Sequence, residues 1–132
     1  MTQTQQVRGT AGADLDGKRN LVVKIDRADN NRIKVASSPT DLDALGILVN
    51  VPRDEEPAFV DFEGVTDGIA GGVITPFTPV TVEANGKLVA AVSTNVKLGV
   101  YAPLPVDGEL LSAAADDLIR VVLFADKTTI KP

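Results

Sequence analysis

The chain has 132 residues, a net charge of −5 at pH 7, 44% hydrophobic residues and only 4% aromatic residues. This length fits one ordinary domain or two very small ones. The acidic charge argues against a nucleic-acid binder or a protein of anionic membrane surfaces, because both need a basic surface. The sequence contains no cysteine and no histidine, which excludes disulfides, thiolate metal sites and the usual general base near neutral pH.

The first stretch of the chain, residues 1–20, is polar and shows no hydrophobic period. It also lacks the apolar core of a secretory signal. Such a segment has little with which to build a core of its own. We therefore expect an extended N-terminal arm over residues 1–20, a β domain over residues 21–126 and a short C-terminal tail over residues 127–132.

From residue 21 onward, short β-branched runs alternate with turn signals, about eight to twelve residues apart, which is typical of an all-β sandwich or barrel. The predicted strands lie within residues 21–26, 32–36, 44–51, 58–62, 80–92, 96–102 and 118–124. One segment, residues 108–118, is rich in alanine and is the single candidate for a short helix.

The strongest local signal is Asn85-Gly86, which lies between two apolar runs. Asn-Gly supplies the two positive-φ positions of a type I′ turn, whose twist matches that of paired strands. A two-residue turn here pairs Val82 with Val89 and Val80 with Ala91.

The two halves of the chain follow the same order of strands and turns, which predicts a pseudo-repeat of residues 21–62 in residues 78–124. The matched segments are 31–36 with 86–91, 45–48 with 98–101, Pro52 with Pro103, and 59–62 with 121–124. Each half alone leaves sheet edges unpaired. Two halves that close on each other would cover most of those edges.

The remaining candidates for chemistry are weak. The carboxylates cluster in polar stretches, where solvated charge explains them better than a paired-acid site. Asp14 and Asp16 lack the other ligands of a calcium loop. Lys87 follows the predicted turn without the flanking residues of a carrier lysine. We expect no catalytic residue, no cofactor and no metal site, and hence no enzyme.

The second half of the chain resembles the small bacteriophage capsid decoration, or cement, proteins over about residues 60–125. The residues that carry the resemblance are Val80, Val82, Gly86, Leu88, Gly99, Val100, Ala102, Arg120, Val122 and Leu123. Pro79 and the extra segment before the last strand depart from the family pattern. The resemblance implies a compact β fold of the β-tulip type that coats an icosahedral head and catalyses no reaction.

From this resemblance we expect a homotrimer, made in the cytoplasm of the host bacterium, that binds the major capsid protein on the outer surface of the virion and stabilises the head by bridging subunits. We expect no nucleic-acid or membrane partner. In the predicted hairpin, Leu88, Ala90 and Val92 share a face too apolar for water. The expected contact residues are Thr4, Gln5, Gln6, Val7, Arg8, Leu88 and Val92, and the expected turn residues are Asn85 and Gly86.

Two alternatives from other classes stay open. A small carbohydrate- or peptide-binding β module would normally present tryptophan or tyrosine for stacking, and this chain has no Trp and one tyrosine, Tyr101. A carrier or enzyme accessory domain would reveal itself by a modified lysine in the intact mass.

Overall fold

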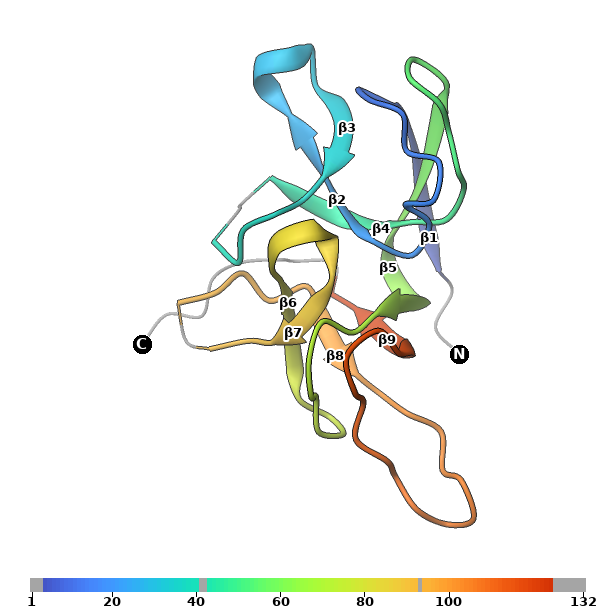
Figure 1. The fold of residues 1–132 in the computed structure, drawn as a ribbon, viewed down its shortest axis with the longest axis vertical. Helices are drawn as coiled ribbons and strands as arrows, with labels where there is room; N and C mark the ends of the chain where they lie inside the picture. The colour runs from blue at the N-terminus through green and yellow to red at the C-terminus, as the bar shows by residue number, and fades with distance from the viewer. Residues whose placement is uncertain (1–3, 41–42, 93, 125–132) are drawn as a thin grey trace.

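The computed structural model describes residues 4–40, 43–92 and 94–124. Within these residues the chain forms nine β-strands and two single-turn 3-10 helices, and it forms no α-helix there (Figure 1). The strands are β1 (Gln5–Thr10), β2 (Val22–Asp26), β3 (Arg32–Val35), β4 (Ala44–Leu48), β5 (Pro57–Ile69), β6 (Pro79–Val82), β7 (Leu88–Ala90), β8 (Gly99–Tyr101) and β9 (Leu118–Leu123). The predicted all-β fold is confirmed.

The two halves of the strand order correspond to each other: β3, β2, β4 and β5 from one end match β7, β6, β8 and β9 from the other end. It runs β3-β2-β4-β5-β9-β8-β6-β7, with β1 also paired to β5, and the ladders between these strands are antiparallel. The first half of β5 pairs with β1 and β4, and its second half pairs with β9. Figure 1 shows β5 running from the upper group of strands into the lower one. The predicted repeat is confirmed, and we define repeat 1 as residues 5–63 and repeat 2 as residues 64–124.

The two repeats match contact by contact. Ala11 forms an isolated parallel bridge with Ile33, and Ala70 forms the same bridge with Leu88. Four pairs of equivalent positions have positive φ angles: Asn20 and Phe77, Asn30 and Asn85, Asn31 and Gly86, Glu55 and Asp116. These matches make β1 the first strand of repeat 1, equivalent to the second half of β5. The repeat is thus longer than the predicted one, which began only at residue 21.

Two glycines mark equivalent close approaches between strands. A Cβ atom at Gly46 would collide with the carbonyl oxygen of Asp61, and one at Gly99 would collide with the carbonyl oxygen of Val122. Since Asp61 therefore matches Val122, the predicted alignment of residues 59–62 with 121–124 is wrong by one residue.

The hydrophobic core repeats as well. One buried cluster lies wholly in repeat 1: Ala11, Leu15, Val23, Ile33, Leu48, Ala58 and Val60. Its counterparts in repeat 2 all belong to the second cluster: Ala70, Ile74, Val80, Leu88, Tyr101, Ile119 and Val121. The second cluster also contains buried residues of repeat 1, which join the two units into one folded body.

The N-terminal segment is part of the folded body. Residues 5–10 pair with β5, and Ala11 and Leu15 are 0% and 2% exposed. The prediction that residues 1–20 lie outside the core is therefore wrong for these two residues. They stand among polar, glycine and small residues, and two isolated apolar positions give no hydrophobic period. The predicted tail, residues 127–132, lies outside the described residues.

The connection between β6 and β7 differs from the predicted two-residue turn. Val80 pairs with Ala90 and Val82 pairs with Leu88, so the predicted register is wrong by one residue. A 3-10 turn over Ala84–Gly86 lengthens the loop, although Asn85 and Gly86 do have the predicted positive φ angles of 70° and 76°. The shift turns Leu88 into the core, where it is 0% exposed. The expectation that Leu88 points away from the face of Val80 and Val82 is therefore wrong, and Leu88 is not accessible as a contact residue.

The predicted helix over residues 108–118 is also absent. Ala113 instead forms an antiparallel bridge with Ile74, and Val106 forms one with Glu109. Alanine favours helix only weakly, and a segment this short needs tertiary packing to stay helical. Here most of its side chains face water, so they offer no buried face to hold a helix.

Candidate functional site

A long loop between β8 and β9 distinguishes repeat 2 from repeat 1. The backbone on either side of this loop is equivalent in the two repeats. The Ile74 amide donates a hydrogen bond to the Ala113 carbonyl oxygen, and the equivalent Leu15 amide donates to the Pro52 carbonyl oxygen. Residues 103–112 stand where repeat 1 has only residues 50–51, and we call them the insertion. In Figure 1 the insertion projects beyond β8 and β9 at the far end of repeat 2. It also explains why the predicted match of Pro52 with Pro103 is wrong.

Backbone hydrogen bonds hold the insertion in one shape. The Val106 and Glu109 amides each donate to the other's carbonyl oxygen, at 2.8 and 2.9 Å. At its base the Tyr101 hydroxyl donates to the Leu111 carbonyl oxygen at 2.9 Å, and the Arg120 guanidinium donates to the Ala102 carbonyl oxygen at 2.7 Å. The loop is therefore fixed at its tip and at its root.

The hydrogen bond from Tyr101 to Leu111 requires a protonated phenol. Burial raises the pKa of Tyr101, and the negative charge of Asp117 adds to this effect. Both causes disfavour the phenolate, so the hydroxyl remains a donor to Leu111 at more alkaline pH than an ordinary phenol would.

The insertion and the start of β9 present several exposed apolar side chains. We call the following residues, which are between 40% and 66% exposed, the apolar surface: Leu104, Val106, Leu110, Leu111 and Leu118. Val73 and Phe77 lie on the neighbouring loop before β6 and are 73% and 60% exposed. None of residues 103–112 is buried, so packing in the core does not explain why the insertion is rich in apolar residues. Clustered exposed apolar side chains of this kind mark interaction sites.

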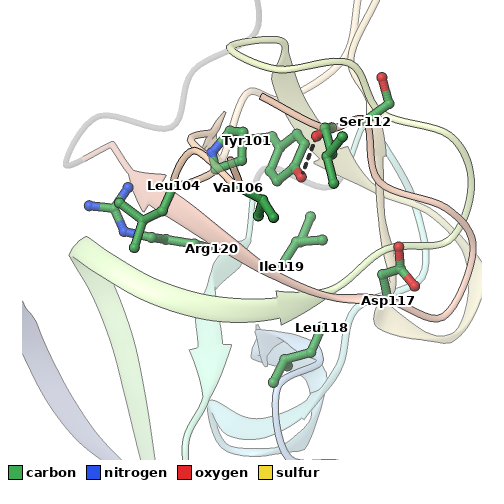
Figure 2. A pocket seen from close by; sticks show the side chains of 10 residues that line it. Tyr101, Leu104, Val106, Ser112, Asp117, Leu118, Ile119 and Arg120 are labelled. Carbon is green, nitrogen blue, oxygen red and sulfur yellow. Dashed lines mark hydrogen bonds between the residues drawn. The ribbon is translucent and has the colours of Figure 1, made fainter. Parts of the chain in front are cut away.

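A hollow of about 400 Å³ lies at the base of the insertion. Figure 2 shows Leu104, Val106 and Ile119 around it, with Arg120 toward one end and Asp117 toward the other. Repeat 1 has a smaller counterpart of about 310 Å³, lined by residues that include Val51, Pro57 and Phe59. The larger hollow combines apolar side chains with Asp117 and Arg120, which suits the anchoring of a partner's side chain.

No group of three or more acidic, histidine or cysteine side chains in the described ranges is placed to hold a metal ion. Asp14 accepts a hydrogen bond from the Asp16 amide, as in a turn. Lys87 forms an ion pair with Asp116 at 2.6 Å.

The structure separates the predicted contact residues. The residues that lie exposed on and beside β1, in repeat 1, are Thr4, Gln5, Gln6, Val7 and Arg8. Two of these side chains are tied to β5: the Thr4 hydroxyl donates to the Val65 carbonyl oxygen, and the Gln6 amide donates to Asp61. Val92 is 62% exposed at the end of β7, in repeat 2. Leu88, as described above, faces the core.

Sequence reasoning missed the apolar surface. The sequence feature that could have revealed it is a turn dipeptide, Asp107-Gly108, with apolar residues on both sides. It lies in a segment that has no match in the first half of the chain. The alanines that follow drew the prediction toward a helix instead.

Among the described residues, no helix is long and apolar enough to span a bilayer. No protein-family model matches the chain, and no curated protein matches it. A solved structure does: the N base of the head fiber gp8.5 of bacteriophage phi29 has a TM-score of 0.65 and 15% sequence identity, with 96% of this chain and 98% of that chain covered. This chain therefore has the fold of a phage head fiber base, and the resemblance to phage head proteins is confirmed at the level of fold.

Proposed function

We propose that this chain is a structural protein of a tailed-phage virion that binds the outer surface of the assembled head and catalyses no reaction. The observation that carries the proposal is the fold, which is shared over nearly the whole of both chains with a phage head fiber base. Fold alone does not fix function. The apolar surface adds the second support, because its side chains are exposed and have no role in the core.

In this proposal the insertion is the principal contact with the major capsid protein. Its apolar side chains would be buried against the capsid, and the adjacent hollow would take a side chain from it. Exposed acidic residues, Asp107, Glu109 and Asp116, surround these groups. Such an acidic rim favours a basic rim on the partner and sets orientation more than affinity.

The exposed side chains of β1 provide a second contact. Val7 and Arg8 lie on repeat 1, away from the insertion on repeat 2. Two separated contacts allow one copy to bridge neighbouring capsid subunits. In a homotrimer, each weak contact would be strengthened by multivalency. The head gains stability by mass action, since the protein binds the assembled lattice in preference to dispersed subunits.

Carbohydrate binding gains no support from the tyrosine of this chain. The Tyr101 side chain is only 6% exposed and its hydroxyl is bonded to Leu111. It therefore offers no ring face for stacking on a sugar.

Pelleting with undecorated heads tests the proposal. The key variant replaces residues 103–112 by Asn-Val, the connection that repeat 1 uses at the same place. It should fold as the wild type does and lose most head binding, while Arg8→Ala should weaken binding less. Asp67→Asn, an exposed change on β5, serves as the matched control. Saturable binding by wild type supports the proposal, and an absence of binding by wild type contradicts it.

A further inference from the structure

The contact between the two repeats uses a different surface on each. Repeat 1 contributes a cap face, formed by Val22, Ala36, Ala44 and Ile47. Repeat 2 contributes a different apolar surface, here called the mouth, which is formed by Val82, Val96, Leu98 and Leu123. Pro39 of repeat 1 completes the contact, because its carbonyl oxygen accepts a hydrogen bond from the Val96 amide at 2.7 Å. The cap face and the mouth belong to one buried cluster.

Because the repeats are equivalent, each also carries the surface that the other one uses. The mouth of repeat 1 has Ile25 and Leu45 at the positions of Val82 and Leu98. Those two residues are half-buried, whereas their counterparts in repeat 2 are 0% exposed. In the part of the chain that the structure describes, the mouth of repeat 1 is therefore less covered than that of repeat 2.

The same holds for the cap face of repeat 2. Its residues are Pro79, Ala91 and Val100, at the positions of Val22, Ala36 and Ile47. All three are half-buried, whereas their counterparts in repeat 1 are 0% exposed. Among the residues that the structure describes, one apolar cap face and one apolar mouth are thus only partly covered, one on each repeat.

Each of these two partly covered surfaces carries a charged residue at a position that is apolar in the contact within the chain. On the cap face of repeat 2, Lys97 takes the position of Ala44. At the mouth of repeat 1, Asp43 takes the position of Val96, and it also pairs with Arg27 at 2.7 Å. Within the chain both positions are apolar, so these charges belong to the partly covered surfaces alone. Opposite charges favour the approach of one surface to the other.

We propose that the cap face of repeat 2 packs on the mouth of repeat 1 of a second copy, and so repeats between chains the contact that joins the two repeats within each chain. The occupant of both surfaces is this same protein. A head-to-tail contact of this kind closes into a ring when its rotation allows. The proposal goes beyond head binding and does not depend on it.

The contact within the chain tells which residues should meet between chains. A Cβ atom at Gly86 would lie 2.8 Å from a methyl of Val35. The counterpart of Gly86 is Asn31, at the mouth of repeat 1, and the counterpart of Val35 is Ala90, beside the cap face of repeat 2. Both Asn31 and Ala90 are exposed. In the proposed contact their Cβ atoms come within the span of a disulfide.

Two single variants, Asn31→Cys and Ala90→Cys, test the contact in this cysteine-free chain. After oxidation, an equal mixture should give covalent dimers on a non-reducing gel, while each variant alone should stay uncrosslinked. Asn31→Cys mixed with Ser112→Cys, which places a thiol on the exposed insertion, is the matched control. We expect roughly tenfold more dimer in the test mixture, because contact raises the effective concentration of the thiols.

Two results would overturn the proposal. One is dimerisation of either variant alone as efficiently as the mixture, which indicates a two-fold contact. The other is a mixture no more crosslinked than its control. Sedimentation gives a second readout: Ala91→Glu should lower the mass of the assembly at unchanged thermal stability, while the exposed change Ala115→Glu should not. A protein that binds heads as a monomer would refute this inference and leave the proposed function standing.

Discussion

Glu55 and Asp116 occupy the same place in the two repeats. Their φ angles are 69° and 70°, and their amides donate to the carbonyl oxygens of Ala11 and Ala70, equivalent residues at the ends of equivalent strands. Each carboxylate also pairs with a basic residue on the matching strand or loop: Glu55 with Arg32 at 3.4 Å and Asp116 with Lys87 at 2.6 Å. An uncommon backbone conformation and its ion pair thus occur twice, which shows that the chain is two forms of one β unit.

The close approach at Gly46 and Gly99 predicts equal sensitivity to a methyl group. Gly46→Ala and Gly99→Ala would each press a Cβ atom against a backbone carbonyl of the next strand. Each change should cost about 1–3 kcal/mol of unfolding free energy. Gly72→Ala is the control, because nothing lies within 4 Å of its added Cβ. Urea unfolding measures all three, and an equal loss for Gly72→Ala would contradict the assignment.

A substitution at Gly86 should lower the stability of the fold by more than the strain of a positive φ angle alone. Gly86 has a φ of 76°, and an added Cβ would also meet Leu21 and Val35 of repeat 1. Gly108 has a φ of 80° with open space around it, so Gly108→Ala should cost only about 1 kcal/mol for the backbone. Gly86→Ala should cost clearly more in thermal unfolding, and Gly86→Val more again. Similar losses at Gly86 and Gly108 would mean that the repeats do not touch at this turn.

The register of the β6–β7 hairpin gives Leu88 a core role. Leu88→Ala should cost about 2–5 kcal/mol, the usual range for a fully buried leucine. Leu104→Ala, at a leucine that is 66% exposed, should change the unfolding free energy by less than about 0.5 kcal/mol. The reverse order in chemical unfolding would restore the register predicted from the sequence.

The fold class and the presence of a repeat could be predicted from the sequence, but the bounds of the repeat could not. Strand patterns survive in both halves because the buried positions, such as Val23 and Val80, repeat with the strand period. The comparison of the two half-sequences failed near residues 103–112, because a residue-by-residue alignment without gaps cannot place an insertion between two short strands. It also missed β1, whose exposed side chains carry no hydrophobic signal. Its pairing with β5 is made by the backbone, which any sequence can supply.

The ion pair of Asp26 predicts a pH-dependent stability. The hydrogen bond from Lys34, at 2.8 Å, holds the pKa of Asp26 below its ordinary value of 3.8. A carboxyl with a lowered folded-state pKa stabilises the fold above its ordinary pKa, and this contribution is lost as pH falls through the lowered value. The melting temperature of Asp26→Asn should therefore lie below that of wild type near neutral pH. The two should converge in acid.

Melting curves from about pH 2 to pH 7 check this prediction. Asp67→Asn, on β5, provides the comparison for a general loss of one negative charge. A gap between wild type and Asp26→Asn that stays constant into strong acid would show that the Lys34 contact does not stabilise the fold.

The most direct test of the account is electron microscopy of undecorated phage heads incubated with saturating protein. We predict added density on the outer surface only, in the shape of the two-repeat body, with the insertion against the capsid and the end of repeat 2 that carries it nearest to the shell. The variant that replaces residues 103–112 by Asn-Val should leave the heads bare. Heads that show no added density with wild-type protein would contradict the account.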